Sequence, residues 1–135
     1  MTPAAVVLAA GASTRMGRPK QLLQHHGRSF VGCAVDLARL AGCAPIIVVT
    51  GAVDLSGEAL APAILVPNPD WPMGQLGSLQ RGLAAALERR ADAPAVLVLT
   101  VDRPHLRPET VTVLVEAWRR DPAGLWQPEQ GGRRG

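Results

Sequence analysis

Four short runs of apolar residues divide the chain, and each run is continuous rather than alternating. They are AVVLA at 5–9, PIIVVT at 45–50, AILV at 63–66 and AVLVLTV at 95–101. Continuous runs rich in Val, Ile and Leu are typical of strands that are buried on both faces, as in a parallel sheet covered by helices. The pattern therefore predicts four buried strands in a parallel sheet.

The segments between the runs carry apolar residues at helical spacing. The first such helix is predicted over 30–40 and is followed by Gly42, a residue type that commonly ends a helix. Two more follow the third and fourth runs, with Pro108 expected in the first turn of the last. Their apolar positions are Leu76, Leu79, Leu83 and Leu87, and then Val111, Leu114, Val115 and Trp118. Residues 22–30 predict a small hairpin that turns at His26–Gly27.

Alternation of strands and helices predicts one doubly wound α/β domain over residues 1–135, with right-handed connections. Between the second and third runs only a dozen residues intervene, so any helix there has one or two turns. Residues 124–127 are predicted to begin a further strand, but a polar, glycine-rich tail follows at 130–135. We therefore expect the domain to be incomplete on its C-terminal side.

Composition excludes several classes of protein. Hydrophobic residues make up 47% of the chain, which excludes a disordered protein. No apolar run approaches the roughly 20 residues that a membrane span requires, and we expect a cytoplasmic protein without a membrane partner. Cys33 and Cys43 do not form a CxxC pair, so we expect two free thiols. Adjacent His25 and His26 are expected on opposite faces of a strand, which argues against a metal site formed by both.

The excess of positive charge is confined to one early segment. The first 35 residues hold four basic residues and no acid, whereas the remainder holds ten basic and eleven acidic residues, which sums to −1. This distribution favours a local site for an anion over a surface that binds polyanions. Aromatic residues make up only 3% of the chain, too few for the stacking platforms of single-strand binders, so no nucleic-acid partner is expected.

A glycine-rich basic loop, LAAGASTRMGRPKQLL at 8–23, follows the first predicted strand. In open α/β sheets ligands bind beyond the carboxyl ends of the strands, and glycines let the backbone approach phosphate oxygens closely. The residues suited to an anion are Gly11, Ser13, Arg15, Gly17 and Lys20. The glycine spacing excludes a Walker A loop and the dinucleotide fingerprint. The alternative interpretation is a basic surface loop with ordinary turn glycines.

Two later segments reach the same edge of the predicted sheet. VPNPDWPMGQLGSLQRGL at 66–83 offers an amide, two glycines and a hydroxyl, groups able to read a base or ribose; they are Asn68, Gly74, Gly77 and Ser78. Its alternative interpretation is a plain loop in which Ser78 caps or lines the next helix, and Trp71 is expected to pack in the loop. In LTVDRPHL at 99–106, Asp102 is a natural anchor for Mg²⁺ beside a triphosphate, although alone it would be read as a turn residue.

Together, the three segments resemble the MobA-like nucleotidyltransferases. LAAG-x-S-x-RMG-x-PK-x-LL resembles their nucleotide-binding loop, and the segments NPDWPMGQLGSLQRGL and VDRPHL resemble those of the molybdenum cofactor cytidylyltransferase branch. The resemblance implies a Rossmann-like, three-layer α/β/α domain with a mostly parallel sheet, truncated at its C-terminal side. It also implies Mg²⁺-dependent transfer of CMP from CTP to the terminal phosphate of molybdopterin, with release of pyrophosphate.

By position, the resemblance assigns the triphosphate to Gly11, Arg15 and Lys20, with Arg15 and Lys20 as the catalytic pair. Lys20 would stabilise charge at the α-phosphorus, and Asp102 would bind Mg²⁺. The base would contact Ala10, Ser78 and the backbone near Gly74. The full set of implied nucleotide-binding residues is Ala9, Ala10, Gly11, Ser13, Gly17, Asn68, Gly74, Gly77 and Ser78.

Three alternatives stay open on the sequence alone. GTP replaces CTP in the guanylyl branch, which usually carries LAGG and a D-K pair where this chain has LAAG and Pro19–Lys20. Transfer to another phosphorylated acceptor is a second alternative within the same class. The third is a non-catalytic module that binds the cofactor and inserts it into a molybdenum hydroxylase apoenzyme.

Overall fold

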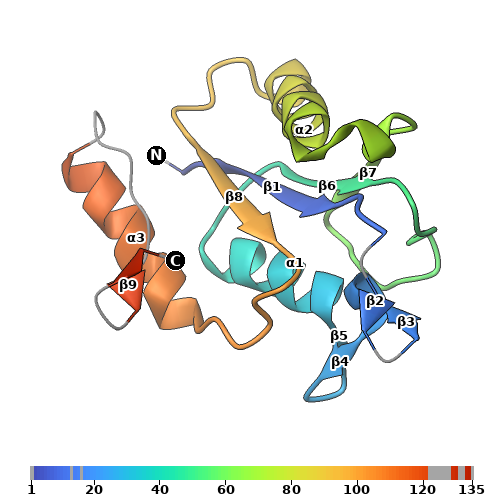
Figure 1. Ribbon diagram of the computed structural model, residues 1–135. Coiled ribbons are helices and arrows are strands. Elements are labelled where there is room, and N and C mark those ends of the chain that lie inside the picture. Colours follow the sequence, from blue (N-terminus) through green and yellow to red (C-terminus); the bar gives the residue numbers. More distant parts are fainter. Residues whose placement is uncertain (1, 13, 16, 122–128, 131–132, 135) are drawn as a thin grey trace.

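A four-stranded parallel sheet forms the centre of the computed structural model (Figure 1). The structure describes residues 2–12, 14–15, 17–121, 129–130 and 133–134. The strands lie in the order β7-β6-β1-β8, and every pair is parallel. Their bounds are Ala4–Ala9 for β1, Ile46–Thr50 for β6, Ile64–Pro67 for β7 and Val96–Thr100 for β8. All four predicted strands are confirmed, as is their parallel arrangement.

Helices cover both faces of the sheet, which confirms the three-layer α/β/α fold. Helices α1 (Phe30–Leu40) and α3 (Pro108–Arg120) pack on one face, where the odd-numbered residues of β1 point. Helix α2 (Gln75–Arg89) packs on the other face, against the even-numbered residues (Figure 1). Because both faces of β1 are buried, each of its six residues is apolar. This burial is the physical reason for the continuous apolar runs.

Helix α2 meets the sheet through small residues rather than through its leucines. Its buried residues are Ser78, Gly82, Ala85 and Ala86, whereas Leu76 is 68% exposed and Leu87 is 46% exposed. A Cβ atom on Gly82 would lie 2.4 Å from Val6 Cγ1, so only glycine lets the helix approach β1 this closely. The predicted helix is confirmed, but Leu76 and Leu87 do not face the core, whereas Leu79 does pack against it.

Short elements connect β1 to α1 and shape the loop that follows the first strand. A hairpin of β2 (Thr14–Arg15) and β3 (Arg18–Pro19) leads into a 3₁₀ turn, η1 (Lys20–Leu22). A second hairpin follows, formed by β4 (Gln24–His25) and β5 (Arg28–Ser29). The Ser29 hydroxyl then caps α1 by accepting a hydrogen bond from the backbone N–H of Gly32 at 3.1 Å.

The second hairpin turns at His26 and Gly27, as predicted, with φ angles of 52° and 79°. Two positive φ angles are what a tight two-residue hairpin turn requires. The same turn makes one expectation wrong: the rings of His25 and His26 lie in edge-to-face contact, with centroids 4.2 Å apart, because His26 has left the strand. Within the described residues, no group of three or more His, Cys, Asp and Glu side chains is placed to hold a metal ion.

Both cysteines are free thiols, as predicted, and burial dominates their chemistry. Burial raises the pKa of the Cys43 thiol to about 11, and Arg119 opposes that shift only in part. Burial also raises the pKa of Cys33, with a further contribution from the Asp36 carboxylate. Both thiols therefore stay protonated near neutral pH and are poor nucleophiles.

The remaining elements are 3₁₀ helix η2 (Trp71–Met73) and a C-terminal hairpin of β9 (Glu129–Gln130) and β10 (Arg133–Arg134). The strand predicted over 124–127 lies outside the described residues. Helix α3 begins with Pro108 and lacks a side-chain cap, since Arg107 occupies the N-cap position. None of the described helices has the length and apolar character needed to cross a membrane.

Candidate functional site

The sheet has its topological switch point between β1 and β8. The chain moves from β1 outward to β6 and β7 on one side, and later returns to place β8 on the other side of β1. In open α/β sheets ligands bind in the crevice beyond the carboxyl ends of the strands at such a point. The loops that leave β1 and β8 begin here, at Ala10 and Val101. The fold alone therefore places a candidate site beside these two loops.

A cavity of about 220 Å³ lies at this point, and we call it the lysine cavity. It brings together residues from the first and third predicted segments, which are separated by some eighty positions in the sequence. Lys20 supplies an ammonium group, and Asp102 supplies a carboxylate. The residues that line it are Leu8, Ala9, Gly11, Lys20, Gln21, Gln75, Thr100, Val101 and Asp102.

A second cavity of about 300 Å³ adjoins the first, and we call it the tryptophan cavity. The two share Leu8, Gly11 and Gln75, so they lie next to each other at the end of β1. The residues that line the tryptophan cavity are Leu8, Ala10, Gly11, Ala12, Trp71, Pro72, Gly74, Gln75 and Ser78. The second predicted segment therefore meets the first here, as expected from the order of the strands.

Two glycines shape the lining of these cavities. A Cβ atom on Gly11 would have no other atom within 4 Å, so the space beside this residue is open to a ligand. Gly74 has φ 115° and ψ 171°, a backbone conformation that residues with a side chain rarely adopt. It sits at the N-cap of α2, which has neither a side-chain cap nor an acidic residue in its first turn. The unpaired N–H groups of this helix end favour an anion at the cavity.

Gln21 holds the loop after β1 in place. This side chain is 2% exposed, and its Nε2 donates hydrogen bonds to the carbonyl oxygens of Ala9 at 2.9 Å and Gly11 at 2.7 Å. Sequence reasoning did not select Gln21. Its position directly after Lys20 and before two leucines, in a segment that returns toward β1, was the signal available.

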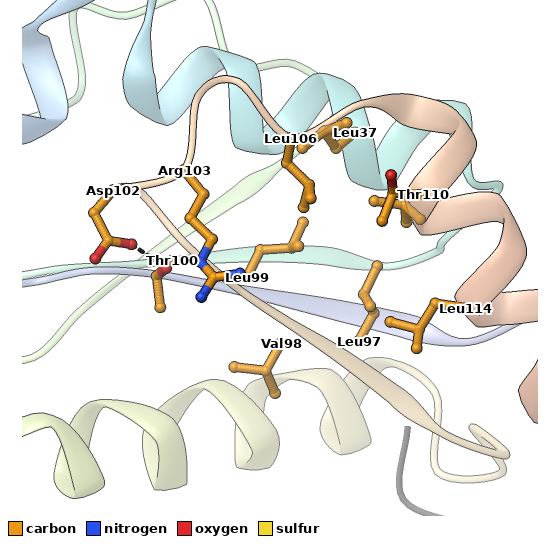
Figure 2. Close-up of a pocket in the computed structure, with 11 residues that line it drawn as sticks. Leu37, Leu97, Val98, Leu99, Thr100, Asp102, Arg103, Leu106, Thr110 and Leu114 are labelled. Carbon is orange, nitrogen blue, oxygen red and sulfur yellow. Dashed lines mark hydrogen bonds between the residues drawn. The ribbon is translucent and has the colours of Figure 1, made fainter. Parts of the chain in front are cut away.

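Asp102 is positioned by a neighbour that sequence reasoning also missed. The hydroxyl of Thr100, the last residue of β8, donates a hydrogen bond to Asp102 Oδ1 (Figure 2). Thr100 lines the lysine cavity with Asp102. A hydroxyl and a carboxylate at the end of a strand form a hard oxygen donor set, the type that Mg²⁺ prefers.

A third cavity, of about 340 Å³, also has Thr100 and Asp102 in its lining (Figure 2). It runs along β8, which is an edge strand of the sheet, and reaches α1 and α3. Figure 2 shows Leu97, Leu106 and Leu114 around it, with Arg103 beside Thr100. Its walls are largely apolar, in contrast to the mixed lining of the lysine cavity.

Two predicted residues lie beside the cavities rather than on their surface. Asn68 is buried, and its Nδ2 donates a hydrogen bond to Ser78 Oγ at 2.9 Å. Its Oδ1 accepts a hydrogen bond from the Asp70 N–H at 3.0 Å, so Asn68 fixes the loop and orients Ser78. Gly77 lines neither cavity, and a Cβ atom there would lie 4.0 Å from Asn68 Nδ2.

The basic hairpin holds the other predicted positions. Gly17 is exposed in the turn between β2 and β3, with φ 75°, and lines neither cavity, so the turn accounts for this glycine. Arg15 lies in β2, where its backbone pairs with Arg18. The side chain of Arg15 and the whole of Ser13 lie outside the part of the chain that is described.

Trp71 both packs against the core and lines a cavity. It is half-buried against the cluster between the sheet and α2, as expected for loop packing. A Cβ atom on Gly51 would lie 2.7 Å from Trp71 Cβ and 2.6 Å from the Ala10 carbonyl oxygen. Gly51 thus lets the indole approach the end of β1, where it forms one wall of the tryptophan cavity.

Residues 5–135 match the protein family described as the MobA-like NTP transferase domain. The chain belongs to this family. A nucleotidyl transferase from Methanothermobacter thermautotrophicus shares its fold, with a TM-score of 0.70 and 29% identity over 85% of this chain and 57% of that one. A Mycobacterium tuberculosis protein solved in complex with manganese gives a TM-score of 0.57 and 26% identity, over 87% of this MobA-like chain and 59% of its own.

Curated relatives of this MobA-like domain have different activities. Nicotine blue oxidoreductase of Paenarthrobacter nicotinovorans is 37% identical over 84% of the chain and 56% of the relative. Molybdenum cofactor guanylyltransferase of Xanthomonas euvesicatoria is 38% identical over 75% of the chain and 47% of the relative. The chain therefore spans about half the length of these two relatives.

Proposed function

We propose that the domain binds a nucleoside triphosphate across the two adjacent cavities and transfers its nucleotidyl group to a phosphorylated acceptor. The observation that carries the proposal is the meeting of Lys20, Gly11 and Asp102 in one cavity, next to a cavity lined by Ser78 and backbone groups. A cation, an open glycine and a carboxylate suit a triphosphate with its metal. A hydroxyl and backbone groups suit a base and ribose.

In this proposal the base occupies the tryptophan cavity. Ala10 and Gly74 offer backbone groups there, and Ser78 offers a hydroxyl that Asn68 holds in place. Such neutral groups can read the edge of a base without adding charge. The indole of Trp71 supplies an apolar wall, so burial of the base contributes to affinity.

The triphosphate occupies the lysine cavity beside Ala9 and Gly11. Lys20 neutralises charge on the phosphates, and the N-terminal end of α2 adds unpaired N–H groups. Arg15, from the hairpin that precedes Lys20, is assigned a second cationic contact. Gln21 keeps the loop carbonyls turned toward its own amide, away from the anion.

The residues present fit a divalent cation held at Asp102. Its carboxylate, set by the Thr100 hydroxyl, gives the oxygen donors that Mg²⁺ prefers, and the remaining positions of Mg²⁺ are commonly filled by phosphate oxygens and waters. When bound, the cation supplies charge neutralisation along the triphosphate. The manganese complex of the structural relative supports a divalent cation in proteins of this fold.

We assign the acceptor to molybdopterin and the nucleotide to CTP. A terminal phosphate oxygen of the acceptor attacks the α-phosphorus, the bond from that phosphorus to the bridging oxygen of the β-phosphate breaks, and pyrophosphate leaves with its electron pair. No enzyme nucleophile takes part, so catalysis consists of positioning and stabilisation of charge at Lys20. Similarity to the molybdenum cofactor guanylyltransferase supports the acceptor class and makes GTP the second candidate nucleotide.

The proposal is tested by release of pyrophosphate from the purified protein. CTP, Mg²⁺ and molybdopterin together should give turnover, and omission of any one, or chelation of the metal, should abolish it. Turnover with GTP but not with CTP, in the presence of Mg²⁺ and molybdopterin, would change the assignment to guanylyl transfer. The protein could instead bind nucleotide without releasing pyrophosphate and form a complex with a molybdenum hydroxylase apoenzyme. That result would change the assigned function from catalysis to cofactor insertion.

A further inference from the structure

The side chain of Gln21 is buried at the lysine cavity with half of its hydrogen-bonding capacity unused. It lies in η1, directly after Lys20, and is 2% exposed. Two hydrogen bonds, to the carbonyl oxygens of Ala9 and Gly11, occupy the amide nitrogen. The Oε1 atom has no hydrogen-bond partner among the residues that the structure describes.

The orientation of this amide follows from its neighbours. The atom within 2.9 and 2.7 Å of two carbonyl oxygens must be a donor, because two acceptors at that distance would repel each other. The NH₂ group therefore faces the loop after β1, and Oε1 is the atom left over. Buried polar atoms in proteins are almost always hydrogen-bonded, so the unpaired Oε1 of a residue that lines the lysine cavity calls for a donor.

The nature of the missing donor is restricted by the chemistry of the proposed ligand. Phosphate oxygens only accept hydrogen bonds, as Oε1 does, so the triphosphate itself cannot pair with it. The Lys20 ammonium lines the same cavity but makes no hydrogen bond to Oε1. Mg²⁺ keeps several of its waters when it binds through one or two carboxylates and phosphates, and a metal-bound water is a strong donor.

We propose that Gln21 is a positioning residue for the divalent cation. Its Oε1 accepts a hydrogen bond from a water on the cation held at Asp102, while its Nε2 fixes the loop that leads to the triphosphate. One amide thus links the metal to the position of the loop carbonyls at Ala9 and Gly11. This inference rests on the proposed function, because it requires a nucleotide–metal complex in the lysine cavity.

The test is the thermodynamic coupling between Mg²⁺ and CTP. The Kd for CTP is measured by calorimetric titration with and without Mg²⁺, and the ratio of the two values gives the coupling. Gln21→Met keeps the length of the side chain and removes both polar atoms, and should lower that ratio about tenfold, the scale of a hydrogen bond to a charged group. Gln80→Met, at an exposed position of α2, is the matched control and should leave the ratio unchanged.

A second variant separates the oxygen from the amide nitrogen. Gln21→Glu retains an oxygen acceptor and loses the donors to the loop, so affinity should fall while the coupling ratio stays at or above that of the wild type. If Gln21→Met does not unfold cooperatively, and so is not properly folded, Gln21→Glu alone tests the role of Oε1. The inference about Gln21 would be overturned if Gln21→Met weakened CTP binding equally with and without Mg²⁺, or if Gln21→Glu lost the coupling. Either result would leave the proposed function standing. Wild-type binding that does not respond to Mg²⁺ would overturn the metal role in the proposed function as well.

Discussion

Lys20→Ala is expected to reduce kcat/KM for release of pyrophosphate by about 10²–10³-fold, the scale for loss of one preorganised charge-stabilising donor. Lys20 is the only lysine in the sequence, so no other ammonium group can take its place. It lines the same cavity as Asp102 and Gly11, to which the proposed function assigns the triphosphate. A steady-state pyrophosphate assay at several concentrations of CTP measures the effect.

Arg18→Ala is the matched control for this prediction. It removes one positive charge two positions away, from an exposed residue of β3 that lines neither cavity. If the substitutions act only by lowering the positive charge near the site, both should reduce kcat/KM alike. If Lys20 contacts the reacting phosphates, only Lys20→Ala should reduce it strongly. Equal kinetics in the two variants, or normal turnover in Lys20→Ala, would contradict the assigned role.

Gly82→Ala is expected to destabilise the fold, although alanine is the better helix former. The added Cβ atom would lie 2.4 Å from Val6 Cγ1 and 3.0 Å from Val49 Cγ2, so α2 must move away from the sheet. Overpacking costs about 1–3 kcal/mol, and the gain in helix propensity returns about 1 kcal/mol. We expect a net loss of up to about 2 kcal/mol in the free energy of unfolding, and failure to fold for Gly82→Leu.

The same change at Gly77 provides the comparison. Gly77 lies in the same helix, but a Cβ atom there would meet only Asn68 Nδ2, at 4.0 Å. Gly77→Ala should therefore leave the free energy of unfolding unchanged or raise it by up to about 1 kcal/mol. Urea denaturation of both variants measures the difference. A Gly82→Ala protein as stable as Gly77→Ala would show that α2 does not depend on its close approach to β1.

The sequence predicts the layers of this fold because burial on both faces leaves a direct trace in the chain. β1 and β6 are covered by helices on both sides, and their residues are almost all apolar. The turn at His26 and Gly27 was predictable for a local reason, since its residue types tolerate positive φ. The packed face of α2 was not predictable, because the close approach of Gly82 depends on Val6 in a distant strand.

The candidate site shows the same division between local and tertiary information. Lys20, Asp102, Ser78 and Gly11 carry chemistry that can be read from residue type and position after a strand, and the structure brings all four to the adjacent cavities. The part played by Gln21 depends on where the carbonyl oxygens of the loop point, which only the folded chain determines.

The most direct test of the central claim is the thermal stability of the protein with CTP, GTP or ATP, each with and without Mg²⁺. A ligand that binds only the folded state stabilises it by about 2.7 kcal/mol at 100 times its Kd. We predict a rise in Tm with CTP that is largest in the presence of Mg²⁺ and smaller with ATP. A cooperatively folded protein whose Tm does not change with any of the three nucleotides would contradict the assignment of the two cavities to a nucleoside triphosphate.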